Sequence, residues 1–444
     1  MFYILLLSYI ILFIVMYRTF KCDLGCPSLQ FVVGFLICSF IALFYKERWN
    51  LNIFHGQTYF LLIGCALVFF ITEIFVLKLT KSANLNNNRL KFEPIENWKL
   101  FLFVVLQILY IFLVSRYIMS QAIRGSELSG ALAEIDQDSK YEGKDLVYPL
   151  HINILRTISL YGGYIWCCLF PFYFQLGKKY IWQKILIFAN LLLTITGSMF
   201  SGSRGSAFPY IFATLMFGYM VLILKKKGKL KIPFRFKVFV LLFVFVFANL
   251  FGQLGKMLGR ETVSEELEST QYLFAVYCGA QIKNLDDYLT NDNIRKENLL
   301  GRNTFDKIYR SIYKLSGEKM PRAKNNIGAF NTVDNWFLGN VRSALAAYFA
   351  DFGWFCFVVV AIFSYIISKL YYNVKKEEFF YTGKPDLTIL LYAYLAFSPF
   401  LSFFGEKFFT RFYLPELIRL LMSGMLIIWF LFKFSVNQNN NRTI

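Results

Sequence analysis

The chain has 444 residues, of which 57% are apolar and 20% aromatic, and it carries a formal net charge of +19. A soluble protein of this length would divide into two or three domains with polar surfaces, whereas apolar runs recur here along almost the whole chain. The composition therefore excludes an ordinary soluble enzyme, and it assigns the basic excess to membrane-flanking loops and not to nucleic acid.

Apolar runs long enough to cross a bilayer predict an all-α polytopic integral membrane protein with about eleven transmembrane helices. The first run has no basic segment before it and no small-residue cleavage site, so we expect a retained helix and not a removed signal. Proline interrupts several runs, which spanning helices tolerate when neighbours satisfy the freed carbonyls. The expected spans are 2–17, 29–45, 58–79, 100–117, 152–175, 181–200, 206–224, 236–252, 352–371, 387–404 and 414–433.

Basic residues in alternate loops set the expected orientation, because Lys and Arg hold loops on the cytoplasmic side. The Lys-rich segment 225–231 and the basic residues near 78–99 and 375–384 then lie inside. This places the N-terminus outside and the C-terminus in the cytoplasm. The expected divisions are helices 1–8 in 1–252, a large external loop with amphipathic helices in 253–351, helices 9–11 in 352–434 and a cytoplasmic tail in 435–444.

Lys and Arg are distributed differently on the two sides. The expected inner loops and helix ends carry 19 Lys against four Arg, whereas the outer helix ends and shorter outer loops carry four Lys against eight Arg. Arginine binds phosphate in a bidentate manner, while lysine acts as a point charge. The excess of outer arginine indicates phosphate recognition there, although some of these side chains also suit lipid headgroups or helix-end carboxylates.

Three outer segments combine arginine with turn residues or carboxylates. SGSRGS at 201–206 places Arg204 in a small-residue turn before a helix, which resembles an anion-binding mouth. NVRSALAAYFADFGWF at 340–355 contains Asn340, Arg342 and Asp351. FFGEKFFTRFYLPELIR at 403–419 contains Glu406 and Arg411. Each also fits a plain structural role, as a tight turn, an interfacial helix or an ion-paired turn.

No motif for ATP, a nicotinamide or a catalytic metal occurs in a plausible context, so we expect no cofactor and a metal-independent protein. The eight cysteines do not form a disulfide framework, and Cys22 and Cys26 lack a second Cys or His pair for zinc. His55 and His151, the two histidines, are not expected to form a metal site.

These residues resemble a known family. GSRG between two spans, YCGAQIKNLDDYL in the long outer loop, the N-x-R…YFADFGWF stretch and the last outer loop are similar to oligosaccharide repeat unit polymerases of the Wzy type. The resemblance implies a GT-C-like membrane glycosyltransferase at the outer face of the bacterial inner membrane. Such an enzyme joins repeat units carried on undecaprenyl pyrophosphate into O-antigen, capsule or a similar surface polysaccharide. It implies active roles for Arg204, Arg342 and Arg411.

The chemistry of that reaction suits the same residues. Displacing a diphosphate from an anomeric carbon builds negative charge that preorganised cations stabilise, and a carboxylate within reach polarises the acceptor hydroxyl. Aromatic side chains of the outer loop suit stacking on sugar faces. The candidate catalytic residues are Arg204, Arg342, Arg411, Glu406 and Asp351. The candidate substrate-binding residues are Gly202, Ser203, Gly205, Arg260, Asn340, Tyr272 and Trp336.

The expected partners are undecaprenyl-pyrophosphate-linked oligosaccharides, membrane lipids, and a chain-length regulator and flippase of the same pathway. Three alternatives stay open. An O-antigen ligase would share the outer arginines and differ in its acceptor. A lipid-linked oligosaccharide flippase or transporter would show pseudo-symmetric halves and charges at mid-membrane, neither of which is evident. A non-catalytic assembly scaffold would leave the arginine distribution unexplained.

Overall fold

A computed structural model describes residues 1–80, 92, 94–121, 128–137, 146–201, 204–225, 270–290, 299–321 and 329–433 of the chain. Within these ranges a few side chains, including that of Arg204, are outside the description. The expected span at 236–252, the basic segment 226–231, the cytoplasmic tail and the candidates Gly202, Ser203 and Arg260 all lie outside the described residues.

The described chain is mostly helical, and eight of its helical stretches are long and apolar enough to cross a membrane. This confirms an all-α polytopic membrane protein. The helices at the centre of these stretches are α1 (Phe2–Thr19), α2 (Pro27–Phe44), α3 (Gly56–Leu79), α4 (Asn97–Gln121), α8 (Ile181–Met199), α9 (Phe208–Lys225), α15 (Cys356–Val374) and α18 (Leu414–Phe432).

Two expected spans are interrupted. The run expected at 152–175 divides into α6 (Leu150–Arg156), a π-helical turn η3 (Thr157–Tyr161) and α7 (Gly163–Phe174). Gly162 and Gly163 follow the π-turn, and a Cβ on either would collide with α18 or α8, so the break lets three helices approach closely. The run expected at 387–404 is α17 (Leu387–Leu395) followed by the 3₁₀ turn η8 (Phe400–Phe403).

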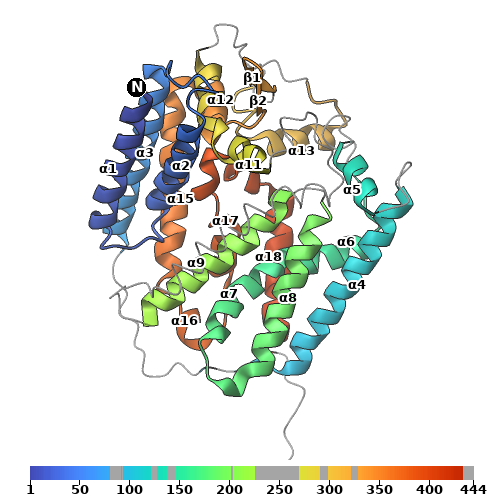
Figure 1. Cartoon of the computed structure of the whole chain (residues 1–444). Helices are drawn as coiled ribbons and strands as arrows, with labels where there is room; N and C mark the ends of the chain where they lie inside the picture. Colours follow the sequence, from blue (N-terminus) through green and yellow to red (C-terminus); the bar gives the residue numbers. More distant parts are fainter. Residues whose placement is uncertain are drawn as a thin grey trace, which may run out of the picture.

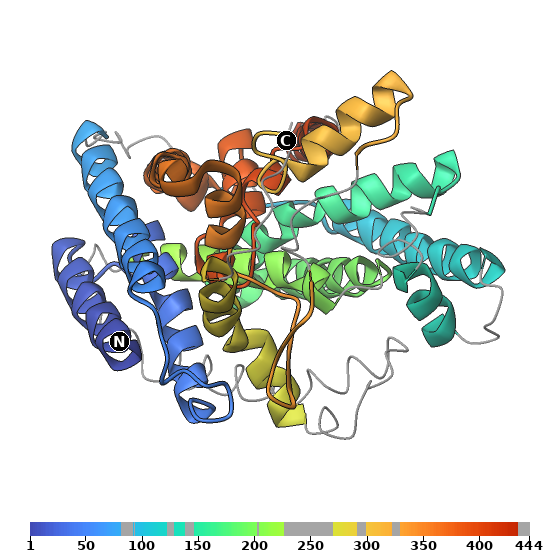
Figure 2. The same ribbon diagram turned by 90° about the horizontal axis from the view of Figure 1, so that it is seen from above.

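The helices form groups on either side of a central helix. α1 and α3 lie at one side of the molecule, α4 and α5 (Leu128–Gln137) lie at the other, and α9 runs between them (Figures 1 and 2). α9 packs on α7, which itself packs on α8 and α17. Tyr164, Trp166 and Tyr173 of α7 are almost fully buried in this core. α7 therefore supplies much of the surface beneath the site described below.

A cap of short elements covers the end of the bundle where α1 and α3 begin (Figure 1). The stretch expected to fold back at 271–289 forms two helices that pack on α2, and the second of them also packs on α3. The β-strands pair antiparallel, with Val333 opposite Trp336. The cap elements are α11 (Thr270–Cys278), α12 (Ala280–Leu289), α13 (Asp306–Ser316), β1 (Asn331–Val333), β2 (Trp336–Gly339) and α14 (Ala344–Phe352).

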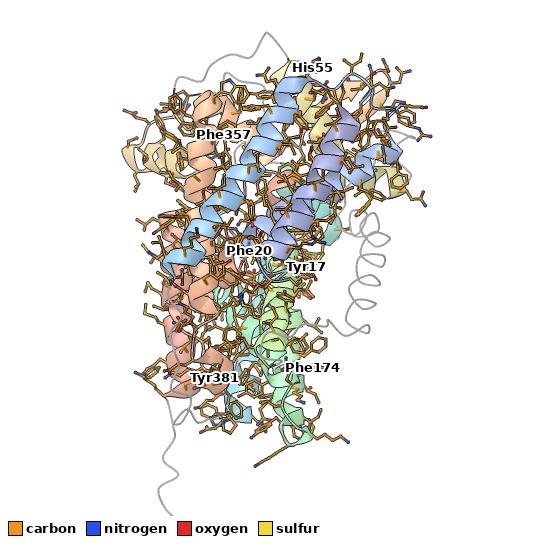
Figure 3. All side chains as sticks on the ribbon, turned by 90° about the vertical axis from the view of Figure 1, so that its left-hand side faces the viewer. Tyr17, Phe20, His55, Phe174, Phe357 and Tyr381 are labelled. Carbon is orange, nitrogen blue, oxygen red and sulfur yellow. The ribbon has the colours of Figure 1, made fainter. Side chains whose placement is uncertain are left out.

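The opposite end of the bundle contains the turn after α7, the ends of α3 and α15, and the short helix α16 (Phe379–Thr382). Figure 3 shows His55 and Phe357 toward the cap, with Phe174 and Tyr381 far from it. The N-terminus and the cap therefore lie at the same end of the helix bundle. We refer to this face as the cap face and to the other as the tail face.

A carboxylate fastens helices together at the tail face. Asp23, in the turn between α1 and α2, accepts hydrogen bonds from Gly25 N at 3.1 Å and the Tyr219 hydroxyl at 3.0 Å. Its second oxygen accepts from the Tyr371 hydroxyl and Lys375 Nζ, both at 2.7 Å. Burial alone would raise the pKa of Asp23, but Lys375 and the hydrogen bonds outweigh it and hold the pKa below its ordinary value.

A second carboxylate lies deeper in the same region. Glu73 of α3 is fully buried and accepts from Ser28 N at 2.7 Å and from the Tyr372 hydroxyl at 3.0 Å. A charged group inside a spanning helix is costly unless it is hydrogen-bonded or paired. Here the first turn of α2 and the last turns of α15 provide the donors, so Glu73 connects three helices.

We predict that Asp23→Asn lowers the free energy of unfolding by about 2–3 kcal/mol, because it leaves Lys375 without its carboxylate. Because the folded pKa of Asp23 lies below the unfolded one, its stabilisation is present above the unfolded pKa and is lost as pH falls through the folded value. Thermal unfolding in detergent between pH 3 and pH 7 measures both effects. Glu47→Gln, at an exposed position, is the matched control.

In the Asp23→Asn variant the acid dependence of the melting temperature should be shallower than in the wild type. Equal melting temperatures at pH 7 for Asp23→Asn and Glu47→Gln would contradict a stabilising role of the Asp23–Lys375 pair.

Candidate functional site

The loop at 404–413, between η8 and α18, is held by one carboxylate. Glu406 Oε1 accepts hydrogen bonds from Phe408 N at 2.8 Å and Phe409 N at 2.6 Å, and its Oε2 accepts from Thr410 N at 2.8 Å. The Tyr348 hydroxyl of α14 donates to Oε1 at 3.2 Å. Glu406 therefore pins three successive amides and fixes the turn η9 (Phe409–Arg411). Burial raises the pKa of Glu406, and the amide hydrogen bonds limit that rise.

Arg411 lies at the end of this turn, on an aromatic surface. Its Cζ is 4.6 Å from the ring centre of Tyr394 and 5.0 Å from that of Phe397, and the Tyr164 side chain borders the same guanidinium. These three rings are buried. Within the described ranges, no carboxylate oxygen lies within 4.0 Å of the Arg411 guanidinium. The guanidinium thus faces the core of the bundle and retains its positive charge for an anion.

The carboxylate that follows Arg411 along the chain is already bound by other groups. Glu416, in the first turn of α18, accepts from Lys307 Nζ at 2.9 Å and from the Tyr394 hydroxyl at 2.7 Å. Lys307 belongs to α13, so this ion pair ties the amphipathic cap helix to the start of α18. Tyr394 connects the ion pair to Arg411. These residues come from elements that are distant in sequence and adjacent in space.

Arg342 approaches the same loop from the cap. Its carbonyl oxygen is 3.6 Å from the position of a Cβ built on Gly405, which precedes Glu406. The guanidinium points elsewhere, because Nη1 donates to the Ala329 carbonyl at 3.2 Å and Cζ lies 5.3 Å from the ring centre of Tyr288. Burial lowers the pKa of Arg342. The structure therefore brings the Arg342 backbone to the loop, while the side chain faces α12.

Arg204 is placed only through its backbone. It begins the 3₁₀ turn η5 (Arg204–Ala207), which leads into α9, and Gly205 follows it at an exposed position. Tyr210 of α9 stacks on Tyr164 at a ring separation of 4.7 Å, and its hydroxyl donates to the Leu160 carbonyl at 2.9 Å. Tyr164 also borders Arg411, so α9, which follows η5, packs beside the Arg411 site.

Asp351 fastens another part of the cap. Its Oδ1 accepts from the backbone and side-chain nitrogens of Asn303 at 3.2 and 2.7 Å, and its Oδ2 accepts from N and Oγ1 of Thr304, both at 2.7 Å. Four donors thus occupy the carboxylate, which holds the segment before α13 against α14.

The aromatic candidates of the cap pack on each other. Tyr272 is buried, and its hydroxyl donates to the Phe337 carbonyl at 3.0 Å. Its ring centre lies 5.3 Å from that of Trp336, and Arg48 covers Trp336 at 4.7 Å. This packing gives both aromatic rings a structural role. Asn340 is exposed on the segment between β2 and α14.

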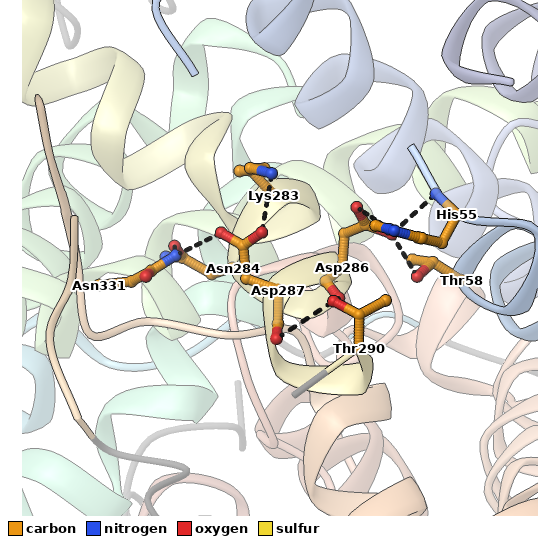
Figure 4. A network of polar contacts seen from close by, with 8 residues as sticks. All are labelled: His55, Thr58, Lys283, Asn284, Asp286, Asp287, Thr290 and Asn331. Atoms are coloured by element: carbon orange, nitrogen blue, oxygen red, sulfur yellow. Dashed lines mark hydrogen bonds and ion pairs between the residues drawn. The ribbon is translucent and has the colours of Figure 1, made fainter. Parts of the chain in front are cut away.

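Two adjacent aspartates of α12 bind groups from different elements (Figure 4). Asp286 is fully buried, and it accepts from the His55 amide at 3.1 Å and the Thr58 hydroxyl at 2.6 Å, with His55 Nδ1 3.0 Å from its second oxygen. Asp287 pairs with Lys283 Nζ at 2.7 Å. The first aspartate therefore fixes α12 to the start of α3.

The other aspartate and its neighbour hold the β-hairpin. Asn331 of β1 donates to Asp287 Oδ2 at 2.8 Å and to Asn284 Oδ1 at 3.0 Å (Figure 4). Asn284 in turn donates to the carbonyls of Leu338 and Val341 at 3.0 and 2.9 Å. The NLDD segment is consequently a structural junction of the cap, which binds the start of α3, both β-strands and the segment before α14.

Sequence patterns placed Arg411 and Glu406 in one loop but missed Lys307, Tyr394 and Tyr164 around them. These residues come from α13, α17 and α7, and no local spacing relates them to Arg411. For these three residues, the only sequence pattern that could have indicated a role was the position of Lys307 on a short amphipathic helix. Searches of protein-family models, curated proteins and solved structures find no match to this chain.

We predict that Glu406→Gln loosens the loop, because a side-chain amide cannot accept hydrogen bonds from all three backbone amides. The expected cost is about 1–3 kcal/mol of stability. Amide hydrogen exchange at 406–412 should become several-fold faster than in the wild type. Glu318→Gln, an exposed carboxylate substitution in the cap, serves as the control. Unchanged exchange in Glu406→Gln would show that the carboxylate does not hold the turn.

Proposed function

We propose that this protein polymerises lipid-linked oligosaccharide repeat units at the outer face of a bacterial inner membrane. The donor is a growing glycan on undecaprenyl pyrophosphate, and the acceptor is the terminal sugar hydroxyl of a new lipid-linked unit. A glycosidic bond forms at the anomeric carbon, the carbon–oxygen bond to the diphosphate breaks, and the acceptor proton is released. The product is a surface polysaccharide such as O-antigen or capsule, and the protein is a glycosyltransferase.

The observation that carries this proposal is the Arg411 guanidinium, which is positioned on buried aromatic rings without a carboxylate in contact among the described residues. A cation in such surroundings is less hydrated than in water, so it attracts an anion strongly. A leaving diphosphate gains negative charge as the anomeric bond breaks. A fixed cation beside it lowers the barrier, by about 3–4 kcal/mol in typical cases where one such group is removed.

The substrate's chemistry also fits the location. A polyprenyl diphosphate keeps its tail in the bilayer and its phosphates at the interface. The 404–413 loop joins a shorter apolar helix to a candidate spanning helix, and we place it at that interface. Arg204 begins the 3₁₀ turn that leads into the helix beneath Arg411. We assign the two arginines to the diphosphate and its approach path. Arg342, whose guanidinium faces α12, is assigned to the acceptor side of the site.

The roles of the two carboxylates require a separate experiment. Glu406 and Asp351 each accept four hydrogen bonds from cap or loop groups, and this favours positioning over abstraction of a proton from an acceptor hydroxyl. Activation of the acceptor by Glu406 predicts a change in the pH dependence of the rate when Gln replaces it. Positioning predicts a lower rate with an unchanged pH profile.

The orientation of the bundle is part of the proposal, with the cap face outside the cell membrane and the tail face in the cytoplasm. We predict that a membrane-impermeant maleimide applied to intact spheroplasts labels Lys314→Cys and fails to label Lys179→Cys. Both residues are exposed, on α13 and on the turn after α7 respectively. Cys22, which is exposed, is replaced by Ser in both variants. Labelling of both sites only after lysis, or of Lys179→Cys alone, would reverse or reject this topology.

The decisive test of function is chain extension in a strain that lacks the gene. We predict that the deletion leaves glycans of a single repeat unit, and that a copy carrying Arg411→Lys restores about a hundredfold less extension than the wild type. Lysine keeps the charge but loses the planar fork that binds two phosphate oxygens. Arg310→Lys, an exposed arginine on α13 that pairs with Asp306, should restore full extension. Gel profiles of the glycans measure the outcome.

Two other results would identify a different protein class. Long polymer that remains on its lipid carrier in the deletion strain would indicate a ligase that transfers finished chains. Accumulation of single lipid-linked units on the cytoplasmic leaflet would indicate a flippase. Full extension by Arg411→Lys, with normal expression, would contradict diphosphate recognition by Arg411.

A further inference from the structure

A second cation lies in the Glu406 loop beside Arg411. Lys407 Nζ is 5.5 Å from the ring centre of Phe404, whose ring stacks on Tyr277 of α11 at 6.1 Å. Its backbone carbonyl accepts from the Ser398 hydroxyl at 3.2 Å. The side chain is only partly exposed. Lys407 is therefore fixed at its backbone and supported along its stem by an aromatic surface.

The charges around Lys407 do not balance. In the part of the chain that the structure describes, no carboxylate oxygen lies within 4.0 Å of Lys407 Nζ. Glu406 attracts it, whereas Arg411 and Lys307 repel it. Burial lowers the pKa of Lys407, with the two neighbouring cations adding to this effect. Glu406 is already committed to three backbone amides, and it offers the ammonium no direct ion pair.

Like charges held together in a partly dry place cost free energy unless an anion binds between them. The loop contains two such cations, Lys407 before the turn η9 and Arg411 at its end, and Arg411 repels Lys407. An anion with a single charge would neutralise one of them. A diphosphate carries charge on two linked phosphates and can contact both.

We propose that Lys407 binds the second phosphate of the lipid diphosphate while Arg411 binds the first. Lys407 thereby makes the site selective for a diphosphate over a monophosphate. This inference rests on the proposed function and deepens it, because it explains how a carrier with two phosphates is distinguished from a carrier with one. Lys407 acts on the substrate by charge, and the Ser398 hydroxyl holds its backbone carbonyl.

The test uses purified full-length protein in detergent, with undecaprenyl diphosphate and undecaprenyl monophosphate as probes. The wild type should bind the diphosphate about tenfold more tightly than the monophosphate, measured by the ligand-dependent rise in melting temperature. Lys407→Gln should bind both lipids equally, and Lys407→Arg should retain the preference. Lys314→Gln, an exposed lysine on α13, should behave as the wild type does. Retention of the full preference by Lys407→Gln would overturn the inference.

A second measurement needs no variant, so it holds if Lys407→Gln does not fold. Acetic anhydride labels lysines of the wild-type protein, and mass spectrometry follows each site. Undecaprenyl diphosphate should slow the labelling of Lys407 several-fold and leave that of Lys314 unchanged. Equal labelling of Lys407 with and without the diphosphate lipid would overturn the inference.

Cardiolipin distinguishes a substrate site from a site for ordinary lipid headgroups, because it also carries two phosphates. It should protect Lys407 far less than undecaprenyl diphosphate does, and equal protection would overturn the assignment to the donor. Failure here is separable from failure of the proposed function. Protection of Lys407 together with normal chain extension in the deletion strain would reject the polymerase and keep the anion site. Loss of extension in the deletion strain without protection of Lys407 would reject only the role of Lys407.

Discussion

The central constraint on this structure is the cost of holding positive charge at the edge of an apolar bundle. Arg411 lies on the buried rings of Tyr394, Phe397 and Tyr164, and Glu416 beside it is bound by Lys307 and Tyr394. Nothing in the described chain neutralises the guanidinium by direct contact. Such an arrangement is unfavourable for stability and favourable for binding an anion, which is the usual relation between strain and function at a site.

The rest of the cap face maintains this arrangement through carboxylates that accept backbone and side-chain donors. Glu406 pins the loop, Asp351 pins the segment before α13, and Asp286 pins α12 to the start of α3. Each is surrounded by donors, which offset the cost of burying a carboxylate. Aspartate and glutamate commonly act as bases in active sites, but these three carboxylates hold neighbouring segments in place. The cations thus remain the chemically available groups.

The tail face is organised differently. Asp23 is paired with Lys375, and Glu73 is satisfied by the Ser28 amide and the Tyr372 hydroxyl. These groups balance one another and join α1, α2, α3 and α15. At the cap face, by contrast, no carboxylate oxygen of the described chain lies within 4.0 Å of the Arg411 guanidinium or the Lys407 ammonium.

The sequence by itself determined the class of the protein, because runs of apolar residues at bilayer length permit little except spanning helices. The sequence also indicated that the outer arginines and the 403–419 loop contain candidate site residues, because charge and residue type can be read directly from the sequence. Only the tertiary structure decided which of these groups meet. The π-turn before α7, the surface of Tyr164 and Tyr394 beneath Arg411, and the return of Lys307 from α13 to Glu416 depend on packing between distant segments. Glu406 and Asp351 read as candidate catalysts in sequence, and their hydrogen-bond donors became evident only once the backbone amides around them were placed, because backbone groups have no signature in the sequence.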